Sequence, residues 1–258
     1  MKQAEWDSKQ YLKFERERTQ PPCDLANRIA LNHPKDVLDV GCGPGNSTNV
    51  LKERFSDAEI LGIDSSPDMI DRAQKQYPEM KFQFFNVENS LASLERKWDV
   101  IFSNACIQWV PDHPRLLRDM LSVLNPGGII AVQIPKQTDA PVHRILRALV
   151  EEPEWKSEFP EPRLFFSLSP ENYFDLFTEF GVEFSIWETI YYQTVRSHEE
   201  ILEWYRGSAL RPYLAVLSCE RKKEFAAVVL ERIRANYPVQ KDGSIIFRFP
   251  RLFFTLEN

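Results

Sequence analysis

Residues 37–48 read Val-Leu-Asp-Val-Gly-Cys-Gly-Pro-Gly-Asn-Ser-Thr, and this stretch decides the fold. Its apolar residues predict a strand covered on both faces, as strands of a parallel sheet are. Gly41, Gly43 and Gly45 let the backbone turn tightly and let a ligand approach where a Cβ would collide. Residues 46–48 are N-cap types for a following helix, whose free N–H groups offer a polar floor. The stretch therefore predicts a strand, a glycine turn and a helix that bind a ligand.

Two acids accompany the glycine turn. Asp39 lies inside the strand before the first glycine, and Asp64 ends a second apolar run, residues 59–64. The spacing G-x-G-x-G differs from the dinucleotide pattern G-x-G-x-x-G, and an acid at 39 suits a cationic group better than a pyrophosphate. Asp64 can accept from both hydroxyls of a ribose. A glycine turn alone is as often an ordinary loop, but with both acids the chain resembles the class I S-adenosylmethionine-dependent methyltransferases.

The amino-acid composition limits the kinds of partner that the chain is expected to bind. The 258 residues carry a net charge of −6, which disfavours a nucleic-acid partner. No apolar run is long enough to cross a bilayer, so no membrane partner is expected. The four cysteines are scattered without a C-x-x-C pair, which predicts neither a metal site nor a redox pair. Unpaired thiols fit a reducing compartment, so we expect a cytoplasmic protein.

Strand and helix patterns alternate through the first half of the chain. The predicted helices lie near 46–55, 67–77 and 113–124, and the predicted strands are 37–41, 59–64, 81–85, 98–104 and 128–135. Two later runs, 184–192 and 244–254, read as an antiparallel edge. This order predicts an α/β, Rossmann-like sheet of seven strands, with ligands at the carboxyl ends of the parallel strands.

Motifs later in the chain indicate one family within this class of methyltransferases. They are Phe-Ser-Asn-Ala-Cys-Ile-Gln-Trp-Val-Pro-Asp-His at 102–113, Ile-Trp-Glu-Thr-Ile-Tyr-Tyr at 186–192, Leu-Arg-Pro-Tyr at 210–213 and Phe-Pro-Arg-Leu-Phe at 249–253. With them the chain resembles the trans-aconitate 2-methyltransferases over nearly its whole length. The resemblance implies methyl transfer from S-adenosylmethionine to a carboxylate of trans-aconitate or a similar small polycarboxylic acid, giving the monomethyl ester. Position 86 departs from the family, which usually has an acid there.

The resemblance also implies a domain plan. We expect one methyltransferase domain over residues 1–258, in which helical segments cap a core. The core is 31–135 with 169–194 and 241–258, and the cap segments are 1–30, 136–168 and 195–240.

The cofactor contacts follow from the same resemblance. Asp39 should face the amino group of the methionine part, and Asp64 the ribose hydroxyls. The amide oxygen of Asn86 should accept from the adenine, more weakly than an acid would. The full predicted set is Asp39, Gly41, Gly43, Asp64, Ser65, Met69, Asn86, Val87 and Asn104.

Methyl transfer to a carboxylate needs no general base, because carboxyl groups have pKa values of about 4 and are already ionised. No catalytic side chain is therefore expected. Arginines suit the remaining carboxylates, since a guanidinium grips a carboxylate with two parallel bonds. The predicted acceptor contacts are Gln108, Trp109, Tyr191, His198, Trp204, Arg211, Arg251, Tyr11 and Arg18. A structural ion pair is the alternative for the arginines, core packing for Trp204, and a helix N-terminal role for His198.

Two other functions stay open on the sequence. One is a methyltransferase of the same fold with another acceptor, such as malonyl carrier protein or a small-molecule hydroxyl. The other is a module that binds the cofactor without catalysis. An intact fingerprint with a complete cap argues against the second. The sequence does not indicate an oligomeric state.

Overall fold

The computed structural model describes residues 15–136, 140–159 and 166–258, and side chains from residue 19 onward. The chain forms two compact units. The first, called the sheet unit, comprises Arg18–Pro135, Phe165–Thr189 and Arg251–Asn258. The second, called the helical unit, includes Lys136–Leu164 and Ile190–Pro250. The predicted division into core and cap of one domain stays a prediction.

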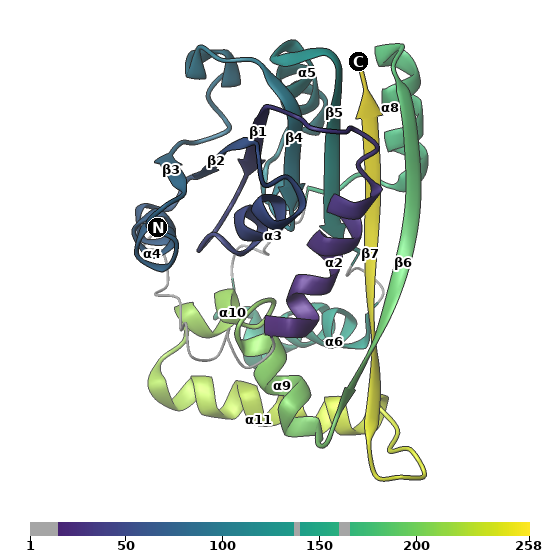
Figure 1. The fold of residues 1–258 in the computed structure, drawn as a ribbon. Helices are drawn as coiled ribbons and strands as arrows, with labels where there is room; N and C mark the ends of the chain where they lie inside the picture. Colours follow the sequence, from purple (N-terminus) through teal and green to yellow (C-terminus); the bar gives the residue numbers. More distant parts are fainter. Residues whose placement is uncertain (1–14, 137–139, 160–165) are drawn as a thin grey trace. The chain divides into compact units, whose positions relative to one another are not determined.

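One seven-stranded sheet, in the order β3-β2-β1-β4-β5-β7-β6, organises the fold (Figure 1). The first five strands pair in parallel, and β7 runs antiparallel to β5. The strands are β1 Asp36–Val40, β2 Glu59–Asp64, β3 Lys81–Phe84, β4 Trp98–Asn104, β5 Leu124–Pro135, β6 Glu183–Val195 and β7 Ile245–Glu257. The predicted Rossmann-like sheet is confirmed. Its order reverses between β1 and β4, which is where such sheets bind ligands.

The helices of the sheet unit begin where the sequence supplies caps. Ser66 Oγ accepts from Met69 N with Pro67 at the first position, and Asp112 and Ser169 cap the next two helices in the same way. These helices are α3 Asn46–Arg54, α4 Pro67–Gln76, α5 His113–Ser122 and α8 Pro170–Phe180, with short 3₁₀ turns η1 Leu91–Leu94 and η2 Ile107–Trp109. Helix α2 Glu15–Arg28 belongs to this unit from Arg18 onward.

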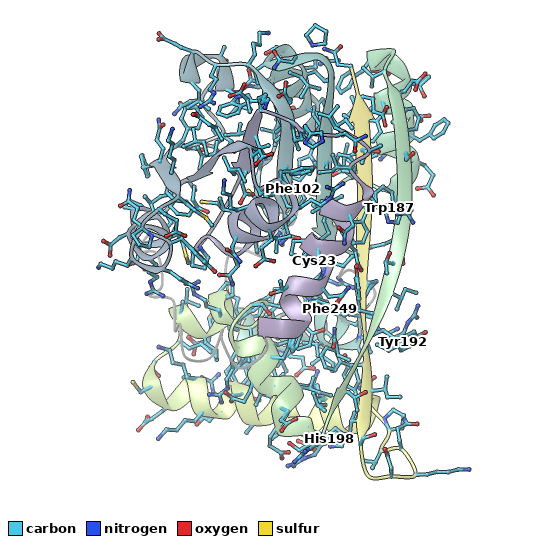
Figure 2. All side chains as sticks on the ribbon, in the orientation of Figure 1. Cys23, Phe102, Trp187, Tyr192, His198 and Phe249 are labelled. Carbon is cyan, nitrogen blue, oxygen red and sulfur yellow. The ribbon has the colours of Figure 1, made fainter. Side chains whose placement is uncertain are left out.

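The two faces of the sheet differ in character. On one face α8 packs its rings on the strands, where Tyr173 and Phe177 each lie 5.0 Å from Phe254 between ring centroids. The opposite face carries Asp39, which is opposite Phe102 in the β1–β4 register. Ser47 and Thr48 of helix α3 donate hydrogen bonds to Asp39. Figure 2 labels Phe102, the β4 residue that pairs with Asp39. One face is therefore an apolar core, and the other holds buried polar groups.

The helical unit has its own core. Trp155 lies edge-on to Phe225 at 4.9 Å between centroids, and the Arg232 guanidinium pairs with both oxygens of Glu152 at 2.7 and 2.8 Å. Its helices are α6 Pro141–Val150, α7 Pro153–Lys156, α9 His198–Arg206, α10 Arg211–Val216 and α11 Cys219–Asn236. Over the residues that the structure describes, none of the helices has the length and apolar character needed to span a membrane.

Candidate cofactor and acceptor site

The glycine turn after β1 requires glycine at its first position. Gly41 has φ +76°, and a Cβ built there would lie 2.1 Å from Cys106 Sγ and 2.3 Å from Cys106 Cβ. The N–H groups of Gly41 and Cys42 both donate to the carbonyl of Ile63, at 2.8 and 3.0 Å. The turn is therefore pinned to the end of β2 and packed under the loop after β4.

Helix α3 starts at residue 46, as the sequence predicts, but it is not capped as predicted. The sequence predicts a cap from residues 46–48, but the N-cap is Gly45, whose φ is +95°, and no side chain caps the helix. Ser47 Oγ and Thr48 Oγ1 instead donate to Asp39 Oδ2, each at 2.7 Å. The capping prediction is wrong because the carboxylate buried in β1 takes both hydroxyls.

Asp39 is the most buried charged group of the site. Its side chain is 0% exposed, and its Oδ1 has no hydrogen-bond partner among the described residues. Burial raises the pKa of Asp39 to about 6, although the hydrogen bonds from Ser47 and Thr48 lower it. A buried carboxylate oxygen without a donor is costly, so this oxygen fits a cationic group of a ligand or a water that bridges to one.

Asp64 is held by backbone donors at the end of β2. Its Oδ2 accepts from Gly43 N at 3.0 Å and its Oδ1 from Ser66 N at 2.8 Å. Burial raises the pKa of Asp64, and these two bonds lower it. A carboxylate has about four acceptor positions, so Asp64 keeps capacity for ribose hydroxyls. The N–H groups of Gly41 and Gly43 are used within the protein, so these glycines offer space rather than donors.

The predicted adenine contacts follow β2 and β3. Asn86 Oδ1 accepts from Glu88 N at 3.0 Å, and its Nδ2 donates to Glu88 Oε2 at 3.3 Å. Val87 is half-buried against the apolar core, Met69 is half-buried and Ser65 is exposed. The Asn86 oxygen keeps one lone pair for a donor such as an adenine amino group.

Replacing Asn86 by Asp should tighten cofactor binding about three- to tenfold, because a charged acceptor bonds about twice as strongly as a neutral one. Calorimetric titration with S-adenosylmethionine measures this. Asn89→Asp is the matched control, since Asn89 is exposed in the same turn and donates its N–H to the Asn86 carbonyl. Equal affinity in Asn86→Asp and the parent chain would remove Asn86 from the adenine site.

The loop after β4 is strained and polar. Ala105 has φ +53°, a left-handed conformation that is unfavourable for a residue with a Cβ. Its N–H donates to the Gln133 carbonyl at 2.9 Å, and its carbonyl accepts from Gln108 Nε2 at 2.6 Å. Asn104 Oδ1 and Gln108 Oε1 are buried without hydrogen-bond partners among the described residues. Strain and unpaired buried acceptors are features of functional sites, so this loop is a candidate binding element.

Three predicted acceptor contacts lie in the sheet unit. Gln108 is 3% exposed within η2, and Trp109 beside it is 40% exposed. Arg251 is 6% exposed on β7, where the register sets it opposite Pro135 of β5. These three therefore lie on the loop after β4 and at the β5–β7 pair, and their acceptor roles stay predictions.

Four others lie in the helical unit. Arg211 is half-buried at the first position of α10, and Tyr191 packs on the core of this unit. His198 Nε2 lies 2.8 Å from the Tyr237 carbonyl oxygen. Trp204 is 1% exposed and packs edge-on to two phenylalanines of β7, at 5.2 and 5.1 Å. His198 and Trp204 thus already have structural contacts, and the acceptor roles of all four stay predictions.

The last two predicted contacts fall at the N-terminus. Tyr11 lies outside the described residues, and Arg18 lies in α2 but its side chain is outside the described part. Their roles also stay predictions.

Sequence reasoning missed three polar side chains. Ser47 and Thr48 donate hydrogen bonds to the Asp39 carboxylate. Gln133 is 1% exposed, and its Nε2 has no hydrogen-bond partner among the described residues. A signal for the glutamine was visible, because it interrupts the apolar run 129–134 of a buried strand. The hydroxyls of Ser47 and Thr48 were misleading, because serine and threonine are also good helix N-caps.

Known proteins resemble this chain in sequence. The family model described as a methyltransferase domain matches residues 14–185. Trans-aconitate 2-methyltransferase of Rhodopseudomonas palustris (strain BisB5) is 38% identical over 97% of this chain and 98% of its own length. Trans-aconitate 2-methyltransferase of Enterobacter sp. (strain 638) is 39% identical over 97% of each chain.

Solved structures share the fold at low identity. The YcgJ protein of Bacillus subtilis has a TM-score of 0.59 at 15% identity, over 93% of this chain and 98% of that chain. Phosphoethanolamine N-methyltransferase 2 of Haemonchus contortus, solved with S-adenosyl-L-methionine, has a TM-score of 0.55 at 14% identity, over 92% of this chain and 52% of that chain. With a matching domain model and curated relatives of 38% and 39% identity along almost their whole length, the chain belongs to the trans-aconitate 2-methyltransferase family.

Proposed function

We propose that this enzyme transfers the methyl group of S-adenosylmethionine to a carboxylate of trans-aconitate or a similar small polycarboxylic acid, giving the monomethyl ester. One observation gives the strongest support for this cofactor. Asp39 Oδ1 and Asn104 Oδ1 are buried acceptors without partners among the described residues, at the ends of the adjacent strands β1 and β4. An ammonium group needs such acceptors, and the methionine part of the cofactor carries one.

The order of the strands supports the rest of the cofactor site. Asn86 follows β3, Asp64 ends β2, Asp39 lies in β1 and Asn104 ends β4, and these four strands are consecutive in the sheet. An adenine, a ribose and a methionine fit these side chains in the same order. When bound, this cofactor supplies a methyl group activated by a sulfonium. The chain's part is to bind and orient it along the carboxyl edge.

The acceptor needs no proton removed. The carboxylate is ionised at neutral pH, so attack on a methyl group requires position and exclusion of water rather than a base. His113, which starts α5 near the β4 loop, is held structurally. Its Nε2 lies 2.7 Å from the Ile107 carbonyl oxygen and its Nδ1 bonds to the Tyr173 hydroxyl. Burial lowers the pKa of His113, and both ring nitrogens are already engaged within the protein.

Two arginines are proposed to hold the carboxylates that are not methylated. Arg251 is buried on β7 beside the end of β5, and Arg211 opens α10. A guanidinium binds a carboxylate through two parallel hydrogen bonds, which fixes both distance and orientation. Such a grip sets the free carboxylate in line with the methyl group.

The cellular setting is proposed from the thiols. Cys23, Cys42, Cys106 and Cys219 are all free, which supports a reducing, cytoplasmic location. A small acid is the proposed partner, and the net charge of −6 disfavours nucleic acid.

The test of the function is a transfer assay with labelled cofactor on trans-aconitate, cis-aconitate, citrate, isocitrate and malonyl carrier protein. We expect trans-aconitate to be methylated with the highest kcat/KM. Activity on the carrier protein alone would refute the proposal. Cofactor binding without transfer to any acceptor would favour a binding module instead.

Replacing Arg211 by Met should raise the KM for trans-aconitate about 10- to 100-fold with little change in cofactor affinity. Loss of a bidentate, charge-assisted grip costs about 1.5–3 kcal/mol, which corresponds to that factor. Steady-state kinetics measure it, and Arg211→Lys should restore part of the loss. Arg234→Met is the control, since this exposed arginine pairs with Glu199 on the surface. A KM like that of the parent chain would show that Arg211 does not hold the acid.

A further inference from the structure

Gln133 is a buried amide that the proposed cofactor site does not use. It lies on β5 between apolar neighbours and is 1% exposed. Its Nε2 is buried and has no hydrogen-bond partner among the residues that the structure describes. A buried donor left without a partner destabilises the folded chain, and such groups occur mainly where a ligand satisfies them.

The register of the sheet places this amide in the polar edge of the site. Gln133 is opposite Asn104 on β4 and opposite Phe253 on β7, and Pro135, two residues on, is opposite Arg251. Paired residues and alternate residues of strands share a face. Gln133 and Arg251 therefore share the face that carries Asn104, which is also the face of Asp39 through its pairing with Phe102.

The order of strands says which ligand part reaches this amide. The proposed cofactor contacts end at β4, and β5 and β7 are the next two strands in the sheet. Gln133 and Arg251 thus follow the methionine part, on the side away from the ribose and adenine. Both present N–H donors, and a carboxylate is the group that accepts from two such donors at once.

We propose that Gln133 Nε2 donates to a carboxylate of the acceptor acid that is not methylated, and that Gln133 with Arg251 sets the preference for polycarboxylic acids. This rests on the proposed function and names the part of the acid that the edge of β5 and β7 binds. The backbone carbonyl of Gln133 accepts from Ala105 N at 2.9 Å, so the strained loop after β4 is hydrogen-bonded to the same residue. The backbone of β5 at Gln133 is thereby held beside the loop after β4.

The cofactor has a carboxylate of its own, so the experiment must separate the two sources. Gln133→Leu removes the donor at nearly constant volume. We expect the Kd for S-adenosylhomocysteine to be unchanged within about twofold and the KM for trans-aconitate to rise about 10- to 100-fold. The preference for tricarboxylic over dicarboxylic acids should fall by the same factor. The melting temperature of the free variant should not decrease, since an unpaired donor is removed. Gln83→Leu, on exposed β3, is the matched control and should change none of these values.

Each other outcome overturns the proposal. A weakened Kd for S-adenosylhomocysteine with an unchanged KM for the acid would assign the amide to the cofactor's own carboxylate. Unchanged Kd, KM and acid preference would make Gln133 a packing residue.

Gln133→Met is measured alongside, because its unbranched chain keeps the buried volume if leucine prevents folding. A parent chain that methylates no acid at all would refute the proposed function and this inference with it, whereas an active parent with an unaffected variant refutes only this inference.

Discussion

Replacing Asp39 by Asn is expected to weaken S-adenosylmethionine binding about 100-fold and to stabilise the free protein at neutral pH. The two effects have one cause, which is the buried carboxylate of Asp39. Its Oδ1 has no partner among the described residues, and its side chain is 0% exposed. A neutral amide cannot attract an ammonium group as a carboxylate does in a dry site, where a charged hydrogen bond is strong.

The gain in stability depends on pH in a definite direction. Burial raises the pKa of Asp39 from 3.8 to about 6, against the hydrogen bonds from Ser47 and Thr48 that lower it. The stabilising contribution of a group whose pKa rises on folding is full below about pH 4 and is lost as pH rises through about 6. At about 1.4 kcal/mol for each pH unit, the loss reaches about 3 kcal/mol by about pH 7.5. Asp39→Asn should recover at most that amount at neutral pH and gain nothing below about pH 4.

Thermal unfolding and calorimetric titration between about pH 4 and 7.5 measure the two effects. The parent chain should bind the cofactor more tightly as pH rises toward about 6, because Asp39 must be ionised to hold a cation. The Asp39→Asn variant should lack this dependence. Asp99→Asn is a control with the opposite sign. Burial opposes ionisation of Asp99, but hydrogen bonds from Asn125 and from the N–H groups of Lys35 and Asp36 lower its pKa, so its loss should destabilise at neutral pH.

Equal cofactor affinity in Asp39→Asn and the parent chain would remove this carboxylate from the site. A second readout comes from Ser47→Ala, which takes one donor from Asp39 Oδ2. It should raise the pKa of Asp39 further and move the rise in cofactor affinity to higher pH. A shift to lower pH would contradict the assignment of Asp39 as the acceptor of the cofactor's ammonium group.

The strand, turn and helix of residues 37–48 were predictable because each rests on local chemistry. An apolar run forms a buried strand, and glycine is favoured where φ is positive, as at Gly41 with +76°. The target of the hydroxyls at 47 and 48 was not predictable, since a cap and a carboxylate compete for the same donors. Only the fold decides that Asp39 lies within reach of both.

Gln133 illustrates the other limit of sequence reasoning. A polar residue in an apolar strand signals a site, but its neighbours across the sheet come from β4 and β7, which are remote in sequence. The partners depend on register, and a slip of one residue would send the side chain to the opposite face. The position of Arg211 relative to a ligand was likewise not predictable, because its motif indicates a family and gives no distance to any ligand.

Replacing Gly41 by Ala is the second large prediction, with an expected loss of about 2–5 kcal/mol of folding stability and of measurable cofactor binding. The left-handed φ of +76° costs about 1–2 kcal/mol for a residue with a Cβ. Overpacking adds about 1–3 kcal/mol, because the new Cβ would lie 2.1 Å from Cys106 Sγ and 2.3 Å from Cys106 Cβ. Denaturant unfolding and calorimetric titration give the two losses.

Two further variants separate the backbone cost from the collision. Gly127 has φ +74°, and a Cβ at this position would meet no atom within 4 Å, so Gly127→Ala should lose only the backbone part. Cys106→Gly in the Gly41→Ala background removes both colliding atoms and should restore most of the excess loss. Equal losses in Gly41→Ala and Gly127→Ala would mean that Cys106 gives way freely. Rescue by Cys106→Gly would show that the glycine turn and the strained loop after β4 are packed as one element, so that the cofactor end and the acceptor end of the site cannot shift independently.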